Sequence, residues 1–314
     1  MKPPCPARRA RRIALTSLAG IIAALFMTSG AAVAASGDLG LTYPRVKTAS
    51  VPDDSVVPII QPLAPSNSCP KQFRAVGGGA SIAGADPDFD LEIQTTEPDP
   101  GDPRAWVNAI DNSTGSTAQA TSFVICERAT SSTVKSRVGR KIVAAGSQGV
   151  ISVSCPRGFK ATGGGADITG DHRAEIASSE PTDGRDANKK NDDAWFAVTN
   201  NGTTQSQHMT VTTVCSKVGR YKVVSTPQVR LPDNTRVAAT ARCPAGSRVT
   251  GGGLGIRGFD NGYEVAGSFP IDGNDKDRLP DNGWTGVANN DGQRTGADSR
   301  RDTRMNTFAV CKVA

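Results

Sequence analysis

The chain has 314 residues, with 36 basic and 30 acidic side chains, two histidines and three tryptophans. Five of the basic residues and none of the acidic ones lie in the first 35 positions, so the remainder is nearly neutral. Such a balance does not favour binding to nucleic acid or to an anionic membrane. Plentiful glycine and proline, with no sustained 3.6-residue apolar period after residue 36, argue against a helical fold.

The first 35 residues have the three parts of a secretory signal peptide. A basic start is followed by an apolar run from Ile13 to Met27 and by the small residues Ala32, Val33 and Ala34. The apolar run is shorter than the roughly 20 residues that a membrane span needs. We therefore expect residues 1–35 to be removed and the protein to be secreted, extracellular and free of the membrane. Paired arginines near the start leave general and twin-arginine export both open.

Residues 36–50 are expected to form a flexible lead, and the rest of the chain repeats one pattern three times. Each copy opens on a Cys-Pro pair, reaches a Gly-Gly-Gly triplet eight residues after that cysteine, and closes on a short apolar segment ending in cysteine. The opening cysteines are Cys69, Cys155 and Cys243; the triplets begin at Gly77, Gly163 and Gly251; the closing cysteines are Cys126, Cys215 and Cys311.

Three further features recur in a fixed order between the triplet and the closing cysteine. A glutamate precedes a β-branched residue, a tryptophan follows, and an asparagine comes six positions after the tryptophan. The glutamates are Glu92, Glu175 and Glu264, and the tryptophans are Trp106, Trp195 and Trp284. The shared order predicts three equivalent modules, at residues 51–129, 130–218 and 219–314.

Six cysteines remain after the signal segment, two in each copy. In an exported chain an even number of cysteines predicts disulfides, and six cysteines allow fifteen pairings. Equivalence of the copies selects one of them: Cys69–Cys126, Cys155–Cys215 and Cys243–Cys311. A loop of about 60 residues closed in this way gains roughly 4 kcal/mol in the chain-entropy model.

Alternating apolar and polar segments, such as residues 150–154 and 237–241, predict strands that lead into each Cys-Pro pair. The expected fold class is all-β, with three repeated, disulfide-closed antiparallel β modules of sandwich-like form. A single pseudo-threefold β-prism remains open as the alternative, because little linker separates the copies. A monomer is expected.

Two threefold sets of side chains are candidate ligand contacts. Glu92, Glu175 and Glu264 can form a threefold contact with a ligand, or can be solvated glutamates on the outer face of a strand. Trp106, Trp195 and Trp284 can present aromatic surface to a ligand, or can fill the core of each module.

No metal site and no cofactor is predicted. The cysteines lack the clustered spacing of a zinc site, and the aspartate-rich loops do not follow the EF-hand ligand order. A phosphate cradle at the glycine triplets is disfavoured, because turn-prone residues rather than a helix follow them. Close approach between backbones explains the glycines better.

The second copy carries the motif most fully: Cys155-Pro156-Arg157-Gly158, Gly163 to Gly165, Ser179-Glu180-Pro181, Trp195, Asn201 and Val214-Cys215. This run resembles a module of exported proteins from high-GC Gram-positive bacteria and the C-terminal module of some bacterial collagen-like chains. The copies are also similar, more distantly, to the three-sheet β-prism of egg vitelline-membrane outer-layer protein. The resemblance implies secretion and β structure, and it implies no catalytic residues.

The expected function is that of a secreted, non-catalytic binding or cell-envelope-associated protein, with a cell-wall glycan or a secreted protein as partner. Three equivalent modules without a reactive constellation suit avid binding. One alternative is an inhibitor or substrate of secreted proteases, presenting the loop from Gly273 to Gly283. Another is an extracellular hydrolase that uses His172 or His208.

Overall fold

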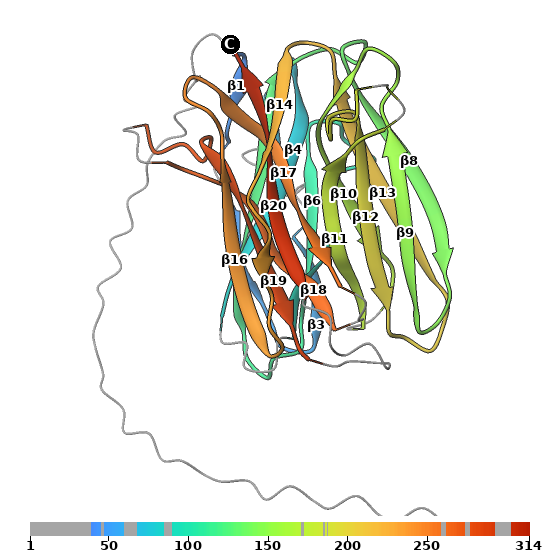
Figure 1. Cartoon of the computed structure of the whole chain (residues 1–314). Coiled ribbons are helices and arrows are strands. Elements are labelled where there is room, and N and C mark those ends of the chain that lie inside the picture. The colour runs from blue at the N-terminus through green and yellow to red at the C-terminus, as the bar shows by residue number, and fades with distance from the viewer. Residues whose placement is uncertain are drawn as a thin grey trace, which may run out of the picture. The chain divides into compact units, whose positions relative to one another are not determined.

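The computed structural model describes residues 39–44, 47–59, 68–84, 90–170, 173–184, 186, 188–258, 262–273, 277–292 and 303–314. The predicted signal peptide lies outside these residues. Every regular element that the structure describes is a β-strand (Figure 1). Among these residues there is therefore no helix, and none that could cross a membrane. The all-β prediction is confirmed.

Five strands in each repeat carry its motif and are named by it, and further strands lie at the edges of the sheets. The lead strands are β3 (Ser55–Ile59), β9 (Ser147–Ser154) and β16 (Thr235–Arg242), and the glycine strands are β4 (Phe73–Ala83), β10 (Lys160–Ile168) and β17 (Arg248–Arg257). The glutamate strands are β5 (Leu91–Pro98), β11 (Ala174–Thr182) and β18 (Tyr263–Ile271), and the tryptophan strands are β6 (Trp106–Asn112), β12 (Ala194–Asn201) and β19 (Gly283–Asn290). The cysteine strands are β7 (Ala118–Arg128), β13 (Gln207–Ser216) and β20 (Arg304–Val313), and edge strands are β1 (Leu41–Thr42), β2 (Lys47–Val51), β8 (Val134–Val143), β14 (Arg220–Ser225) and β15 (Val229–Arg230).

The strands form three antiparallel sheets, and every sheet takes strands from two repeats. Their orders are β1-β7-β4-β18-β19-β16 with β2 on β7, β3-β6-β5-β10-β13-β8, and β14-β20-β17-β11-β12-β9 with β15 on β20. At each junction the glycine strand of one repeat pairs with the glutamate strand of another. The pairing of β4 with β18 joins the first repeat to the third and closes the ring.

Within one repeat, the glycine and cysteine strands lie in one sheet, whereas the lead, tryptophan and glutamate strands lie in another. In the first repeat β4 contacts β5 and β6, and in the second β12 contacts β13 while β8 contacts β9. The strands of one repeat are thus divided between two sheets. Three antiparallel sheets that share strands in this way fit either a sandwich-like or a prism arrangement.

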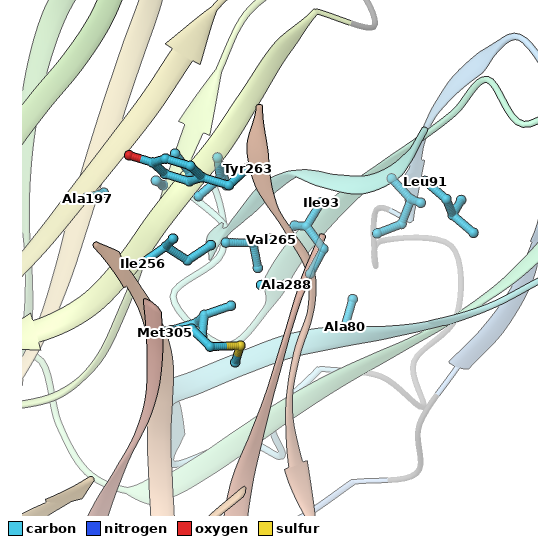
Figure 2. Packing of buried hydrophobic residues seen from close by; sticks show 14 of the residues in the cluster. Ala80, Leu91, Ile93, Ala197, Ile256, Tyr263, Val265, Ala288 and Met305 are labelled. Atoms are coloured by element: carbon cyan, nitrogen blue, oxygen red, sulfur yellow. The ribbon is translucent and has the colours of Figure 1, made fainter. Parts of the chain in front are cut away.

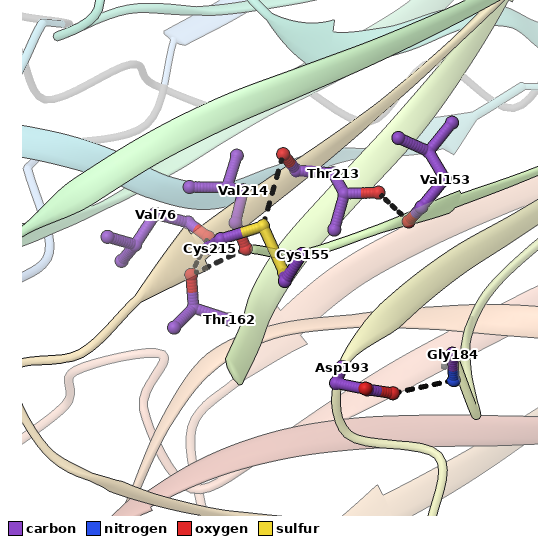
Figure 3. The surroundings of a disulfide bond; sticks show 9 residues. All are labelled: Val76, Val153, Cys155, Thr162, Gly184, Asp193, Thr213, Val214 and Cys215. Carbon is purple, nitrogen blue, oxygen red and sulfur yellow. Dashed lines mark hydrogen bonds between the residues drawn. A yellow bond between two sulfur atoms is a disulfide. The ribbon is translucent and has the colours of Figure 1, made fainter. Parts of the chain in front are cut away.

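All three predicted disulfides are present, at Cys69–Cys126, Cys155–Cys215 and Cys243–Cys311. Each one links the segment before a glycine strand to the cysteine strand paired with it. Figure 3 shows the second disulfide, where the Thr162 hydroxyl lies between the carbonyl oxygens of Val76 and Val214, at 3.2 Å from each. Val76 belongs to the first repeat, so this bond crosses between repeats.

The first glycine of each triplet lies where the three glycine strands meet. A Cβ atom on Gly77, Gly163 or Gly251 would lie 2.9 to 3.0 Å from the Cα of Gly251, Gly77 or Gly163, in that order. These contacts run around the ring, each glycine against the next. Close backbone approach therefore accounts for the first glycine, as the sequence predicts.

The middle glycine faces the tryptophan of its own repeat. A Cβ atom on Gly78, Gly164 or Gly252 would collide with the indole ring of Trp106, Trp195 or Trp284 respectively. Every indole is fully buried, and each indole nitrogen donates to a hydroxyl on the neighbouring glutamate strand: Thr96, Ser179 and Ser268, at 2.9 to 3.0 Å. The tryptophans are thus core residues of the modules.

The asparagine six residues after each tryptophan stabilises the turn through which the chain passes from one sheet to the next. Asn201 Nδ2 donates to the carbonyl oxygens of Val143 (2.9 Å), Ala144 and Gln205. Asn112 makes the equivalent bonds to Val51, Pro52 and Ser116. Buried amides therefore fix the turns from β2 to β3 and from β8 to β9.

The flexible lead predicted at residues 36–50 requires correction. Strands β1 and β2 both pair with β7, and Leu41 and Thr42 are buried. This segment completes the edge of a sheet, as β8 and β14 do for the other two sheets. Apolar side chains from all three sheets meet in one cluster, which includes Ala80, Ile93, Ile256 and Val265 (Figure 2).

Candidate binding sites

The three predicted glutamates lie on strands that contact one another, β5, β11 and β18. None is a solvated surface residue: Glu92 is 2% and Glu264 5% exposed, and Glu175 is partly buried by surface area, with its carboxyl enclosed. The outward, solvated alternative is therefore wrong for these residues. Contact with a ligand stays a prediction.

Further carboxyls influence the ionisation of these glutamates. Burial raises the pKa of Glu92, and the charges of Glu264, Glu175, Asp111 and Asp90 raise it further. The pKa of Glu175 is raised to about 8 by burial and by Asp291, against a lowering hydrogen bond from Asn200. Of these acidic neighbours, Asp111 is buried, Asp291 is half-buried and Asp90 is exposed.

The tryptophans offer no surface to a ligand, because all three are 0% exposed. As ligand contacts they require correction. Each indole ring packs against a glycine backbone, and its N–H group donates to a buried hydroxyl, so neither the ring face nor the N–H group is accessible to a ligand. The core-packing interpretation of these residues is the one that the burial supports.

Two of the grooves among the described residues lie at the junctions where a glutamate strand of one repeat meets the strands of another. The first groove joins the first and second repeats and contains Arg74, Glu97, Lys135, Arg137, Val138 and Arg140. The second joins the second and third repeats and contains Val150, Glu180, Phe196, Val198, Arg257 and Tyr263. An exposed valine lies in each, Val138 at 48% and Val150 at 46% exposure.

Each groove has a glutamate at the same position of the repeat, directly before the proline of the glutamate strand. Glu97 accepts a hydrogen bond from the Thr212 hydroxyl at 2.8 Å, and burial raises its pKa to about 7 although Arg140 lowers it. Glu180 is 2% exposed and pairs with the half-exposed guanidinium of Arg257. Burial raises the pKa of Glu180 despite that pairing.

The third junction lacks this arrangement. Phe269 replaces the glutamate there and stacks on Phe123, with ring centroids 5.9 Å apart. Aligning Glu97-Pro98, Glu180-Pro181 and Phe269-Pro270 could have revealed the pair of glutamates from the sequence. The grooves themselves depend on pairing between strands of different repeats, which the repeat pattern does not specify.

Among the described aspartate-rich loops, Asp183, Asp186 and Asp193 bring one oxygen each within 4.8 Å of one another. Asp186 pairs with Lys160 at 3.1 Å, and Asp193 accepts a bond from the Gly184 amide (Figure 3). These bonds stabilise the loop, and this structural role accounts for the proximity of the three aspartates. His208 is exposed on β13, and His172 lies outside the described residues.

Comparison with protein families and with curated proteins finds no match to this chain. The three disulfides suggest an oxidising setting for the folded protein.

Proposed function

We propose that the protein is a secreted, non-catalytic binding protein that holds an acidic glycan of the cell envelope in the first and second grooves. The observation that carries this proposal is the cationic first groove. Arg74, Lys135, Arg137 and Arg140 line it, against the two carboxyls of Glu97 and Asp99. The same side chains lie beside exposed apolar surface at Val138.

Both grooves combine features that a charged sugar polymer needs. Guanidinium groups bind carboxylates, sulfates and phosphates through paired hydrogen bonds. The second groove contains Arg257, which pairs with the buried carboxylate of Glu180, and the ring of Phe196. Aromatic and aliphatic side chains supply the apolar surface on which a sugar ring can lie.

Two grooves on one molecule also favour an extended ligand over a small one. Each groove bound alone can be weak, because a polymer that occupies the first one is presented to the second at high effective concentration. Secretion and the signal peptide belong to this proposal, and the disulfides support them.

A binding assay with the purified protein tests the proposal. Retention is measured on immobilised acidic polysaccharide, on immobilised neutral dextran and on isolated cell walls, at low and high salt. We expect retention on the acidic polymer and on the walls that falls as salt rises, because salt screens exposed charges. No retention on any surface, or equal retention on dextran, contradicts the proposal.

Paired variants locate the site. Arg137→Ser together with Arg140→Ser should weaken retention at least tenfold, and Arg257→Ser should weaken it to a smaller degree. Arg157→Ser is the matched control, since Arg157 is exposed on a loop outside both grooves. Equal losses for the control and the groove variants would assign the effect to net charge alone.

The two other functions predicted from the sequence can be checked with the same sample. In the described part of the 273–283 loop, Arg248 pairs with Asp277 and Asp281, which anchors the loop and leaves Arg278 exposed. Inhibition of a subtilisin-like protease or a metalloprotease, or cleavage after Arg278, would favour the protease interaction. Release of soluble sugar from the cell walls would favour the hydrolase.

A further inference from the structure

The hairpin formed by β8 and β9 lies between the first and the second groove. Along the chain, Arg140 is the last residue of β8 in the first groove, and Gln148 of β9 is the first residue in the second. The two strands contact each other, although each is the edge strand of a different sheet (Figure 1). We call residues 141–147, which connect the two grooves along the chain, the bridging segment.

Apolar side chains are exposed along this hairpin. Ile142 of the bridging segment is 63% exposed, and the groove residues Val138 and Val150 are 48% and 46% exposed. They are three of the five large apolar residues that are exposed among the described residues. Single exposed apolar residues need no explanation, whereas several on one hairpin indicate an interaction surface.

Positive charge follows the same course. From Arg128 to Ala166 the chain has seven basic residues and no acidic one. Side chains alternate along a strand, so Arg140 and Val138 share one face of β8. Arg137 and Lys141 project from the other face, and all three cations are exposed. Cations on both faces of an edge strand favour an anionic chain that passes around that edge.

The turn of this hairpin differs in chemistry from its two equivalents. Residues 143–147 (VAAGS) align with residues 51–55 (VPDDS) and 231–235 (LPDNT). The fourth residue has a positive φ in all three turns: 50° at Asp54, 65° at Gly146 and 53° at Asn234. Only the second repeat has two exposed alanines where the others have proline and aspartate. The turn between the grooves therefore lacks the negative charge that would repel an anionic ligand.

We infer that the bridging segment carries a single acidic polysaccharide chain from the first groove, around the edge of β8, into the second groove. This inference rests on the proposed function, because it concerns the same ligand and the same grooves. The exposed cations of β8 bind the acidic groups of the chain, and Ile142 covers the apolar face of a sugar ring. The two grooves are then the ends of one extended site, which selects a ligand by length as well as by charge.

Titration with oligogalacturonates of increasing length, from the disaccharide to the polymer, tests the inference. Calorimetry on the purified protein gives the affinity and the stoichiometry for each length. Short oligomers should occupy the two grooves separately. Oligomers that span the hairpin should bind as one chain per protein, with an affinity at least about tenfold higher, because the second groove then meets its ligand at high effective concentration.

A double variant, Lys141→Ser with Ile142→Thr, changes the bridging segment and leaves both grooves intact. Its affinity for short oligomers should stay within about twofold of the unmodified protein, whereas the gain for long oligomers should fall at least about fivefold. Lys217→Ser with Val218→Thr is the matched control, since it removes the same charge and an aliphatic side chain that is 41% exposed, outside both grooves. The control should keep the full gain.

The turn supplies a second variant. Ala144→Pro, Ala145→Asp and Gly146→Asn together give the second repeat the turn of the third, whose backbone has the same positive φ. This variant should fold like the unmodified protein, bind short oligomers as well, and lose part of the gain for long ones, because its aspartate repels the chain.

The outcomes separate the inference from the function on which it rests. Binding of short oligomers without a gain for long ones, or an equal gain in both bridging variants, would overturn the inference and leave the proposed function standing. Absence of binding at every length would refute the two together. Stronger binding to phosphatidylglycerol vesicles than to polygalacturonate, lost in the Lys141→Ser, Ile142→Thr variant, would assign the segment to a lipid surface and contradict the inference.

Discussion

Gly163 of the second repeat rests against Gly77 of the first, such that a Cβ atom on Gly163 would lie 3.0 Å from the Gly77 Cα. The obstacle is backbone from another sheet, which cannot rotate away as a side chain does. Gly163→Ala should therefore lower the free energy of unfolding by roughly 2 to 4 kcal/mol, as overpacking of a rigid core does. Urea unfolding measures the change. Gly101→Ala, on an exposed loop, is the control and should change stability by less than about 0.5 kcal/mol.

The corner asparagines should be as sensitive as core residues. Asn201→Ala removes three donated bonds and leaves the buried carbonyl of Val143 with one partner fewer. We expect a loss of roughly 2 to 3 kcal/mol, and faster hydrogen exchange at the turn between β8 and β9. Asn188→Ala, in an exposed loop, serves for comparison. Equal stability of the two variants would contradict a structural role for the corner amide.

A large part of this fold follows from the sequence, because its repeats carry strong local signals. The three disulfides, the strand character and the close approach at the glycines are all predictable from residue types at fixed spacing. Burial of Trp106 and its equivalents is one of the two alternatives that the sequence allows. What repeat spacing cannot give is the partner of each strand, since β4 has the same pattern whether it pairs with β5 or with β18.

The same limit explains the errors at the sites. Glu92 alternates with Ile93 on its strand, which predicts an outer face for the glutamate, and that face is covered once the repeats form a ring. Strands β1 and β2 lack the motif of the repeat, so nothing in residues 36–50 marks them as the edge of a sheet. Their pairing with β7 joins residues roughly 70 to 85 positions apart, from Val51 with Ala118 to Leu41 with Glu127.

Loss of one disulfide should destabilise the whole ring. Replacing Cys155 and Cys215 by alanine opens a loop with a sequence separation of 60 residues, worth about 4 kcal/mol in the chain-entropy model. Because each sheet continues into another repeat, we expect one cooperative transition at a lower denaturant midpoint. Two resolved transitions, seen by near-ultraviolet circular dichroism of Trp195 and its equivalents, would mean that the repeats unfold independently.

Stability should depend on pH through Glu97. Its pKa of about 7 in the folded protein lies above the value near 4.5 of an exposed glutamate, so its contribution is complete below pH 4.5 and is lost as pH rises through 7. Glu97→Gln stays neutral at every pH. It should be more stable than the unmodified protein at pH 8, by on the order of 1 to 2 kcal/mol, and no more stable at pH 4.

Urea midpoints at the two pH values give that comparison. Asp54→Asn, which changes an exposed carboxyl, is the control and should show no such crossover. A Glu97→Gln variant whose advantage is the same at pH 4 and pH 8 would show that packing, and not ionisation, causes it.

The pairing of β4 with β18 also determines which fragments of the gene can yield a stable product. A chain that stops after the second repeat leaves the inner edges of β4 and β11 without their neighbours β18 and β17, with unpaired backbone amides and carbonyls facing water. Such edges recruit other chains and lead to aggregation. Expression of one or two repeats should therefore give insoluble material, whereas joining the two ends and opening the chain between repeats should preserve a soluble protein.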